Sequence, residues 1–168
     1  YSAVNIDRVA KLAGTTRAAI YRRAKTPGEL VVALLVSRFG IDPASDSGNL
    51  REDLRHIQEL QRHFFVDPMV QAALAGVLSD LRDDDGLGEV FYARFMEPRR
   101  RSVAAMLTRA ADRGEIAPPS HPGVISDLLT GPLLLRVAVP PTGSIDDTLV
   151  NATIEAALAA CGAPTTPG

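Results

Sequence analysis

Apolar residues recur along the chain at the three- and four-residue spacing of amphipathic helices. No segment shows the strict alternation of a half-buried strand. A polar, turn-forming stretch at residues 41–48 separates a short first part from a longer second part. The pattern therefore predicts an all-α protein with an N-terminal domain over residues 1–40 and a larger helical domain over residues 49–161.

The first 22 residues predict two short helices joined by a tight turn. Asn5 is a suitable N-cap for the first helix. Four apolar residues then share one helix face: Ile6, Val9, Ala10 and Ala13. Gly14 suits the left-handed residue after a helix, and Thr16 can cap the second helix. Small Ala10, Gly14 at the turn and Ile20 between the helices have the spacing of a helix-turn-helix, although an ordinary helical hairpin is the alternative.

The outward face of the second helix is basic, with Arg17, Tyr21, Arg22 and Arg23, and Lys25 just beyond. Basic side chains attract phosphates, and arginine can also read guanine edges. Residues 1–40 carry a net charge of +5, which leaves −7 for the remainder of a chain whose total is −2. A basic head on an acidic body is typical of a DNA reader with a separate ligand- or partner-binding domain, although chance clustering of charges is the alternative.

A third helix is predicted to begin at Pro27. Thr26 and Glu29 have the spacing of a capping box, and Pro27 occupies the first helical position. The free N-terminal amides of this helix, next to Lys25, would suit a DNA phosphate. Its apolar positions are Leu30, Val31, Leu34, Leu35 and Phe39.

The run VAKLAGTTRAAIYRRAKTPGELV resembles the signature VAxxAGVSxxTLYxxFxxKxEL of the N-terminal domain of TetR-type transcriptional regulators. The matching residues are Val9, Ala10, Ala13, Gly14, Thr16, Ile20, Tyr21, Glu29 and Leu30. The resemblance implies that Thr16 and Arg17 open a recognition helix and that Tyr21 contacts the DNA backbone. The residues expected to bind DNA are Thr16, Arg17, Ala18, Tyr21, Arg22, Lys25 and Thr26.

Two positions depart from the family's pattern. Ala24 stands where the family has a bulky aromatic residue, and Pro27 stands where it has a lysine that contacts phosphate. Lys25 can partly replace that contact. The family's domain also has a helix before this hairpin, which is missing from the sequence. If the protein itself lacks this helix, we expect the apolar backs of Ile6 and Ile20 to be partly exposed and DNA binding to be weak.

Five further helical patterns follow, beginning at Asn49, beginning at Asp67, and spanning residues 87–113, 124–139 and 144–160. Pro98 lies inside the longest pattern, where we expect a kink. Gly131 and Pro132 are expected to interrupt the helix at 124–139. The stretch LTRAADRGEI…DLLTGPLLLRV is similar to the C-terminal bodies of TetR-type proteins, though less specifically than the head.

The sequence favours neither an enzyme nor a metal site, and it predicts no cofactor. It contains no nucleophile elbow, no glycine-rich phosphate loop and no HExxH motif. His56 and His63 would lie about 10 Å apart along one helix and would need a third ligand to hold a metal. We expect the acidic residues 83–85 to be a solvated helix stop, and the arginines 99–101 to be solvated or ion-paired.

The lone Cys161 cannot form an intrachain disulfide and fits a reducing compartment, as an inert filler in preference to a reactive thiol. The chain has no run of about 18 apolar residues and no signal segment, so no membrane span is predicted. We therefore expect a cytoplasmic protein.

The resemblance implies a ligand-responsive transcriptional regulator, with a repressor favoured, that binds a pseudo-palindromic DNA operator as a homodimer. The alternative is a helical protein-interaction module that does not bind DNA. Bulky apolar residues are predicted to line an effector pocket, with plain core packing as their alternative: Phe64, Phe65, Met69, Phe91, Phe95 and Met106. Few charged residues share these faces, which favours a small apolar or weakly polar effector.

The last two helices, at 124–139 and 144–160, are unusually apolar and are predicted to form the dimer interface. The residues expected to be buried there are Leu133, Leu134, Val137, Leu149 and Ile154. The alternative is that these residues cover the core of a single chain.

Overall fold

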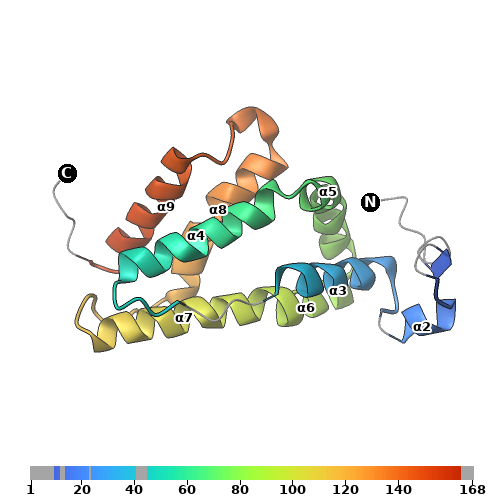
Figure 1. The fold of residues 1–168 in the computed structure, drawn as a ribbon, viewed down its shortest axis with the longest axis horizontal. Coiled ribbons are helices and arrows are strands. Elements are labelled where there is room, and N and C mark those ends of the chain that lie inside the picture. The colour runs from blue at the N-terminus through green and yellow to red at the C-terminus, as the bar shows by residue number, and fades with distance from the viewer. Residues whose placement is uncertain (1–9, 12–13, 23, 41–44, 164–168) are drawn as a thin grey trace. The chain divides into compact units, whose positions relative to one another are not determined.

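The computed structural model describes residues 10–11, 14–22, 24–40 and 45–163, and within these ranges it contains helices and no strands (Figure 1). The predicted all-α fold is therefore confirmed. The elements are α2 (Arg17–Tyr21), α3 (Pro27–Phe39), α4 (Leu50–Val66), α5 (Pro68–Asp83), α6 (Asp85–Phe91), η1 (Tyr92–Met96), α7 (Glu97–Asp112), α8 (Pro122–Ala138), η2 (Pro140–Thr142) and α9 (Asp147–Ala160). The predicted cap Asn5 and the apolar positions Ile6, Val9 and Ala13 lie outside the described residues.

The chain forms two compact units. The head unit comprises residues 1–41 with 72–98, and the body unit comprises residues 42–71 with 99–168. Close contacts thus group α6, η1 and most of α5 with the N-terminal helices. The division of the sequence into domains at 1–40 and 49–161 stays a prediction.

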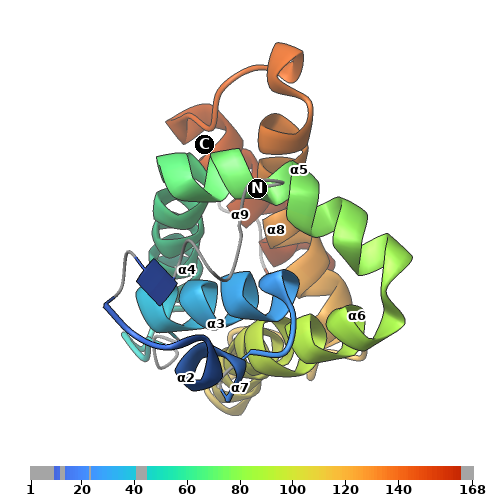
Figure 2. The same ribbon diagram turned by 90° about the vertical axis from the view of Figure 1, so that its right-hand side faces the viewer.

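In the head unit, α3 packs against α6 and η1 (Figure 2). Thr26 caps α3 as predicted, whereas the Glu29 side chain bonds the residue before the cap and not the cap itself. Thr26 Oγ1 accepts the backbone N–H of Glu29 at 3.1 Å, and Glu29 Oε2 accepts the backbone N–H of Lys25 at 2.7 Å. The first bond satisfies a donor that the first turn of a helix leaves without a partner, and the second fixes the backbone just before the cap, so the start of α3 is well defined.

The junction of α6 and α7 contains a π-helical turn. The Glu97 N–H donates to the carbonyl of Tyr92, five residues earlier. Pro98 follows two residues after this turn and has no N–H to give to the helix ladder; the kink expected near Pro98 stays a prediction. α5 ends at Asp83 and residues 83–85 are exposed, as expected of a solvated helix stop, and Asp84 in addition caps α6 by accepting the N–H of Leu87 at 3.1 Å.

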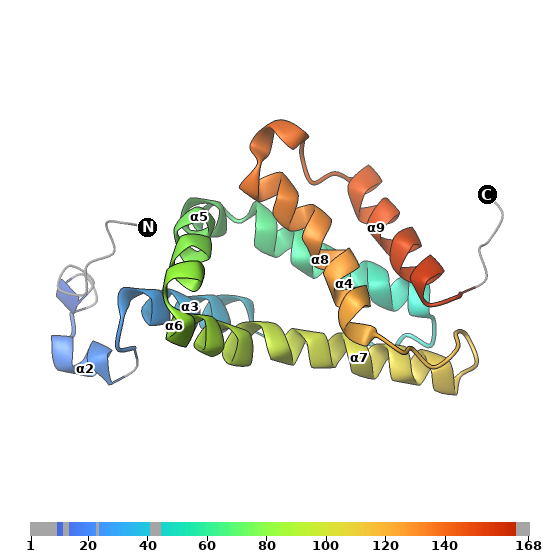
Figure 3. The ribbon, with the colours of Figure 1, turned by 180° about the vertical axis from the view of Figure 1, so that it is seen from behind.

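In the body unit, α8 and α9 pack against each other and both pack on α4. α4 lies in front of α8 in Figure 1 and behind it in Figure 3. Among the described residues, the core between these helices and α7 contains 14 that are buried: Leu50, Leu54, Val103, Met106, Leu107, Ala110, Ile116, Ile125, Leu129, Val150, Ile154, Ala157, Leu158 and Cys161. The predicted N-cap of α4 is confirmed, since Asn49 Oδ1 accepts the N–H of Glu52 at 3.2 Å.

The expected interruption of α8 at Gly131 and Pro132 is wrong, because the helix is continuous from Pro122 to Ala138. A proline inside a helix removes one backbone hydrogen bond. Leu129 and Leu133, on either side of the proline, are both fully buried. The burial of these two side chains favours the helical conformation and offsets the missing bond.

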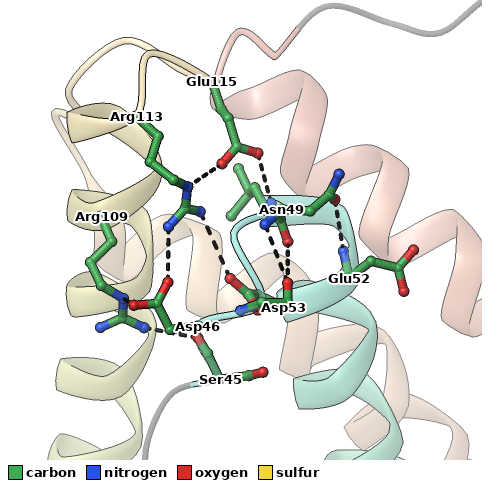
Figure 4. A network of polar contacts seen from close by, with 10 residues as sticks. Ser45, Asp46, Asn49, Glu52, Asp53, Arg109, Arg113 and Glu115 are labelled. Carbon is green, nitrogen blue, oxygen red and sulfur yellow. Dashed lines mark hydrogen bonds and ion pairs between the residues drawn. The ribbon is translucent and has the colours of Figure 1, made fainter.

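A charged cluster ties the segment before α4 to the C-terminal end of α7 (Figure 4). Arg113 donates from Nε to Glu115 Oε1 at 2.6 Å and from Nη1 to Asp46 Oδ1 at 3.0 Å. Glu115 Oε2 also accepts the N–H of Leu50, the first residue of α4, at 2.7 Å. The hydrogen bond to Glu115, more than any other contact, raises the pKa of Arg113.

Asp53 is the fully buried member of this cluster. Its Oδ1 accepts the N–H of Ser47 at 2.9 Å, and its Oδ2 lies 3.9 Å from Arg113 Nη2. Arg109 adds a bond from Nη2 to the carbonyl of Ser45 at 2.9 Å. We call this cluster the linker clasp; its charged members are Asp46, Asp53, Arg109, Arg113 and Glu115.

Candidate DNA-binding surface and effector-binding body

The corner before α2 has the predicted geometry. Gly14 has a φ of +61°, the left-handed conformation that favours glycine. The Thr15 N–H donates to the carbonyl of Ala10 at 3.0 Å, and the Gly14 N–H donates to the carbonyl of Lys11 at 3.4 Å. Thr16 Oγ1 then accepts the N–H of Ala19 at 3.2 Å and caps α2. The chain therefore turns at Gly14 and begins a new helix three residues later.

The inner side of this corner is apolar. Ala10 and Ile20 are buried together, with Leu30 packed against them. Ile20 is only 7% exposed, so the expectation that it would be partly exposed is wrong, because Leu30 of α3 and Ala10 cover it. Ile6 lies outside the described residues. Ala24, at the position where the family has an aromatic side chain, is also buried.

The outer side of α2 is open to solvent within the head unit. Six of the seven residues predicted to bind DNA are exposed: Thr16, Arg17, Ala18, Tyr21, Arg22 and Lys25. Thr26 is half-buried because its hydroxyl caps α3. Arg23, also predicted on this face, lies outside the described residues. The arrangement offers guanidinium and ammonium groups and a phenol, which suit the phosphates and base edges of a duplex.

The six residues predicted to line an effector pocket fall in both units. Phe64, Phe65, Met69 and Met106 belong to the body unit, and Phe91 and Phe95 belong to the head unit. The rings of Phe64 and Phe65 meet edge to face with centroids 5.0 Å apart, and those of Phe91 and Phe95 stack at 5.2 Å. Met106 is fully buried in the body core, which agrees with the alternative interpretation of this residue as plain core packing.

The body also carries a polar hollow of about 460 Å³ between α4 and α9, which the sequence did not predict. Its lining comprises Arg55, Glu59, Arg62, Asp147, Val150 and Asn151. Arg62 pairs with Glu59 at 2.7 Å and with Asp147 at 2.6 Å, and the hydrogen bond that Arg62 donates to Asp147 is the main reason why the pKa of Arg62 is raised. Because these charges neutralise one another, the hollow differs from an apolar effector pocket.

Two glutamines on the inner side of α4 were missed by the sequence analysis. Gln58 is fully buried, and Gln61 has a buried side-chain oxygen. The sequence does contain a signal for their burial. The two amides lie between Leu54 and Phe65 on one otherwise apolar helix face, with spacings of four, three and four residues. An amide on such a stripe must find partners inside the protein or in a ligand.

Two of the residues predicted for the dimer interface are inside the body of one chain. Leu133 is 0% exposed and Ile154 is 1% exposed, which agrees with the alternative that these residues cover the core of a single chain. Leu134, Val137 and Leu149 are half-buried. The solvent side of α8 is formed by other apolar residues, among them Val124 and Leu135, which are 52% and 50% exposed.

The histidines and the arginines 99–101 differ in their surroundings. His56, His63 and His121 are exposed, and no three His, Cys, Asp or Glu side chains of the described residues could hold a metal ion together. Burial lowers the pKa of Arg99 to about 10, whereas Arg100 pairs with Asp127. No single helix within the described ranges could cross a membrane, and only the bent pair α4 and α5 has the length and composition to do so.

Residues 44–157 match the family described as "Tetracyclin repressor-like, C-terminal domain". The uncharacterised HTH-type transcriptional regulator Rv1556 of Mycobacterium tuberculosis is 30% identical over 154 residues, which are 89% of this chain and 73% of that protein. The DNA-binding transcriptional repressor TetR of Mycobacteroides abscessus is 25% identical over 157 residues, which are 92% of this chain and 81% of that protein.

Two solved structures have the same fold. The TetR family transcription regulator SCO0332 superposes with a TM-score of 0.78 at 22% identity, over 98% of this chain and 88% of that one. The flavonoid-responsive regulator FrrA superposes with a TM-score of 0.65 at 23% identity, over 99% of this chain and 90% of that one. With the match over residues 44–157 and the 30% identical relative, these findings mean that the chain belongs to the TetR family of transcriptional regulators.

Proposed function

We propose that this regulator is a ligand-responsive repressor that binds a pseudo-palindromic operator as a homodimer in the cytoplasm. The observation that carries the DNA part is the exposed basic face of α2, which follows the left-handed corner at Gly14. α2 acts as the recognition helix, with Arg17 at its start reading bases and Lys25 beyond its end contacting phosphate. A relative named as a DNA-binding transcriptional repressor supports the repressor part.

The dimer forms through the solvent side of α8 and α9. On α8, the exposed or half-buried residues Val124, Leu128, Gly131, Leu135 and Ala138 follow one another at spacings of four, three, four and three. This is the spacing of a seam between packed helices. On α9, the exposed residues Ala152, Ala156 and Ala159 allow a second helix to approach closely. A twofold axis that pairs α8 and α9 with their copies would bury both stripes.

The ligand part rests on the body helices. A structural neighbour is named flavonoid-responsive, and the body of this chain has the same fold. An effector that binds more tightly to the conformation that fits DNA poorly would lower operator affinity by that difference in binding free energy. The aromatic residues Phe64 and Phe65 and the flexible Met69 remain the proposed apolar contacts.

Selection of bound sequences from random duplexes by the full chain tests the proposal. An inverted repeat with half-sites about one helical turn apart is expected for a dimer. Arg17→Ala should relax base preference at one position of each half-site. Lys25→Ala should weaken binding to all sequences alike, and the slope of log affinity against log salt concentration should become shallower by about one. Arg101→Ala, which removes one exposed charge from α7, serves as the control and should leave selection unchanged.

The outcome also separates the two function classes. A helical protein-interaction module would bind no duplex with sequence preference at any salt concentration. Equal losses for Arg17→Ala and Lys25→Ala on every sequence would refute the division of roles between base reading and phosphate contact.

A further inference from the structure

Gln58 carries a buried acceptor without a donor. Its side chain is 0% exposed at the centre of the body unit, where α4 meets α8 and α9. Its Nε2 donates to the carbonyl of Leu129 at 3.2 Å and to the hydroxyl of Thr153. Among the described residues, no donor reaches Gln58 Oε1. A buried carbonyl oxygen without a hydrogen bond is unfavourable, so a donor from outside the chain would stabilise this arrangement.

Rotating the amide cannot resolve the problem. The Leu129 carbonyl can only accept, so the atom that faces it must be the nitrogen. The Thr153 hydroxyl already donates its proton to the carbonyl of Val150 at 2.7 Å, and it therefore also accepts from Gln58. Both neighbours require the nitrogen on their side, which fixes Oε1 as the unpartnered atom.

Gln61 presents a second acceptor of the same kind. Its Oε1 is buried and has no hydrogen-bond partner among the described residues. Gln61 follows Gln58 by three residues, so the two side chains neighbour each other on the surface of α4. The stripe on which they stand runs from Leu54 to Phe65, both of which are buried, and contains no charged residue at these four positions.

We infer that Gln58 and Gln61 form the hydrogen-bond-accepting wall of the effector site, and that the effector is an uncharged, largely apolar molecule carrying an N–H or O–H donor. The inference rests on the ligand response proposed above and specifies its chemistry. Leu54 and Phe65 on the same stripe are apolar and buried, and a charged group placed beside them without a partner would be strongly disfavoured. The two carbonyl oxygens select for a donor, because a molecule of the same shape without one leaves both acceptors unpaired.

The test compares indole with indene, which have nearly the same shape and differ in the N–H donor. Each is titrated into the full chain labelled with ¹⁵N, and the side-chain amide signals of the glutamines are followed by NMR. We expect indole to bind about tenfold more tightly than indene and to shift the Gln58 amide signal. Equal affinities, or no shift of that signal by millimolar indole, would overturn the inference, as would a crystal structure with an ordered water on Gln58 Oε1 that indole leaves in place.

Three variants locate the effect. Gln58→Leu removes the acceptor and should reduce the preference for indole to less than about twofold. Thr153→Val removes one partner of Nε2 but keeps the Gln58 carbonyl, so it should retain the preference. Gln61→Leu, at a half-buried position, should reduce the preference in part and carries the test if Gln58→Leu does not fold. An undiminished preference in both glutamine variants would also overturn the inference.

The same samples separate this inference from the proposed function. If the protein selects an inverted repeat but binds indole no more tightly than indene, the proposed regulator function is supported and the inferred effector chemistry is refuted. If the protein prefers indole but selects no DNA sequence, the proposed regulator function is refuted and the inferred hydrogen-bond-accepting site on α4 is supported.

Discussion

Gly28 of α3 lies so close to Leu87 of α6 that a Cβ atom at residue 28 would stand 2.5 Å from Leu87 Cδ2. Leu87 is only 4% exposed, so its side chain has little space into which it could move. The hydrogen on Gly28 is therefore what allows the first turn of α3 to pack directly on α6. This contact holds α3, the helix that follows α2, against the part of the chain that leads into α7.

Gly28→Ala should lower the free energy of unfolding by about 1 kcal/mol. Alanine stabilises a helix relative to glycine by roughly 0.5–1 kcal/mol, but overpacking at a filled site costs about 1–3 kcal/mol. Urea unfolding of the full chain measures the balance. Gly88→Ala in α6, where the nearest atom is the Leu81 carbonyl oxygen at 3.6 Å, is the control and should stabilise by about 0.5 kcal/mol. Stabilisation by both variants would contradict the tight contact.

The head could be predicted from sequence because its geometry depends on local signals. A glycine at the corner, Thr16 as cap, and Thr26 with Glu29 each act within four residues, and each has the predicted partner or conformation. The burial of Ile20 against Ala10 follows from its predicted place between the two helices, whereas the packing of Leu30 against it could not be predicted in this way, because Leu30 lies on another helix.

The body was harder to predict because its faces are set by tertiary contacts. Leu133 and Leu135 are identical residues on one helix, yet one is fully buried and the other is 50% exposed. Nothing in a uniformly apolar segment decides which of them faces the core. The role of Gln58 was hidden for the same reason, since its partners Leu129 and Thr153 lie 71 and 95 residues away in the sequence.

The difference between these two leucines also yields a prediction. Leu135→Glu places a charge on the proposed dimer face and should convert the dimer to a folded monomer at micromolar concentration. Leu133→Ala should instead destabilise each chain by about 2–5 kcal/mol and leave the folded fraction dimeric. Sedimentation velocity and urea unfolding distinguish the two effects. A dimer that survives Leu135→Glu would exclude this face of α8 as the interface.

The linker clasp should depend on the carboxylate of Asp53. Asp53→Ala removes the acceptor for the Ser47 N–H and should lower the free energy of unfolding by about 1–3 kcal/mol, since a backbone donor is left unpaired. Asp53→Asn keeps an oxygen for that bond and should cost less. Hydrogen exchange of the Ser47 amide provides a local measurement, with faster exchange in Asp53→Ala than in Asp53→Asn. Equal exchange in the wild-type protein and both variants would show that the clasp does not hold this segment.

Cys161 should make the stability of the body depend on alkaline pH. Burial raises the pKa of its thiol above the ordinary value, so the folded chain binds the proton more tightly than the unfolded chain does. The stabilisation is fully present below the unfolded pKa of about 8.5 and is lost as the pH rises through the folded pKa. Cys161→Ala removes this dependence and serves as the reference in urea unfolding at pH 8 and pH 10. The advantage of the wild-type protein over Cys161→Ala should shrink between the two pH values, and native protein at pH 8 should react with a thiol reagent far more slowly than protein in urea. Fast labelling of the native chain would mean that the thiol is open to solvent and that the pH effect has another source.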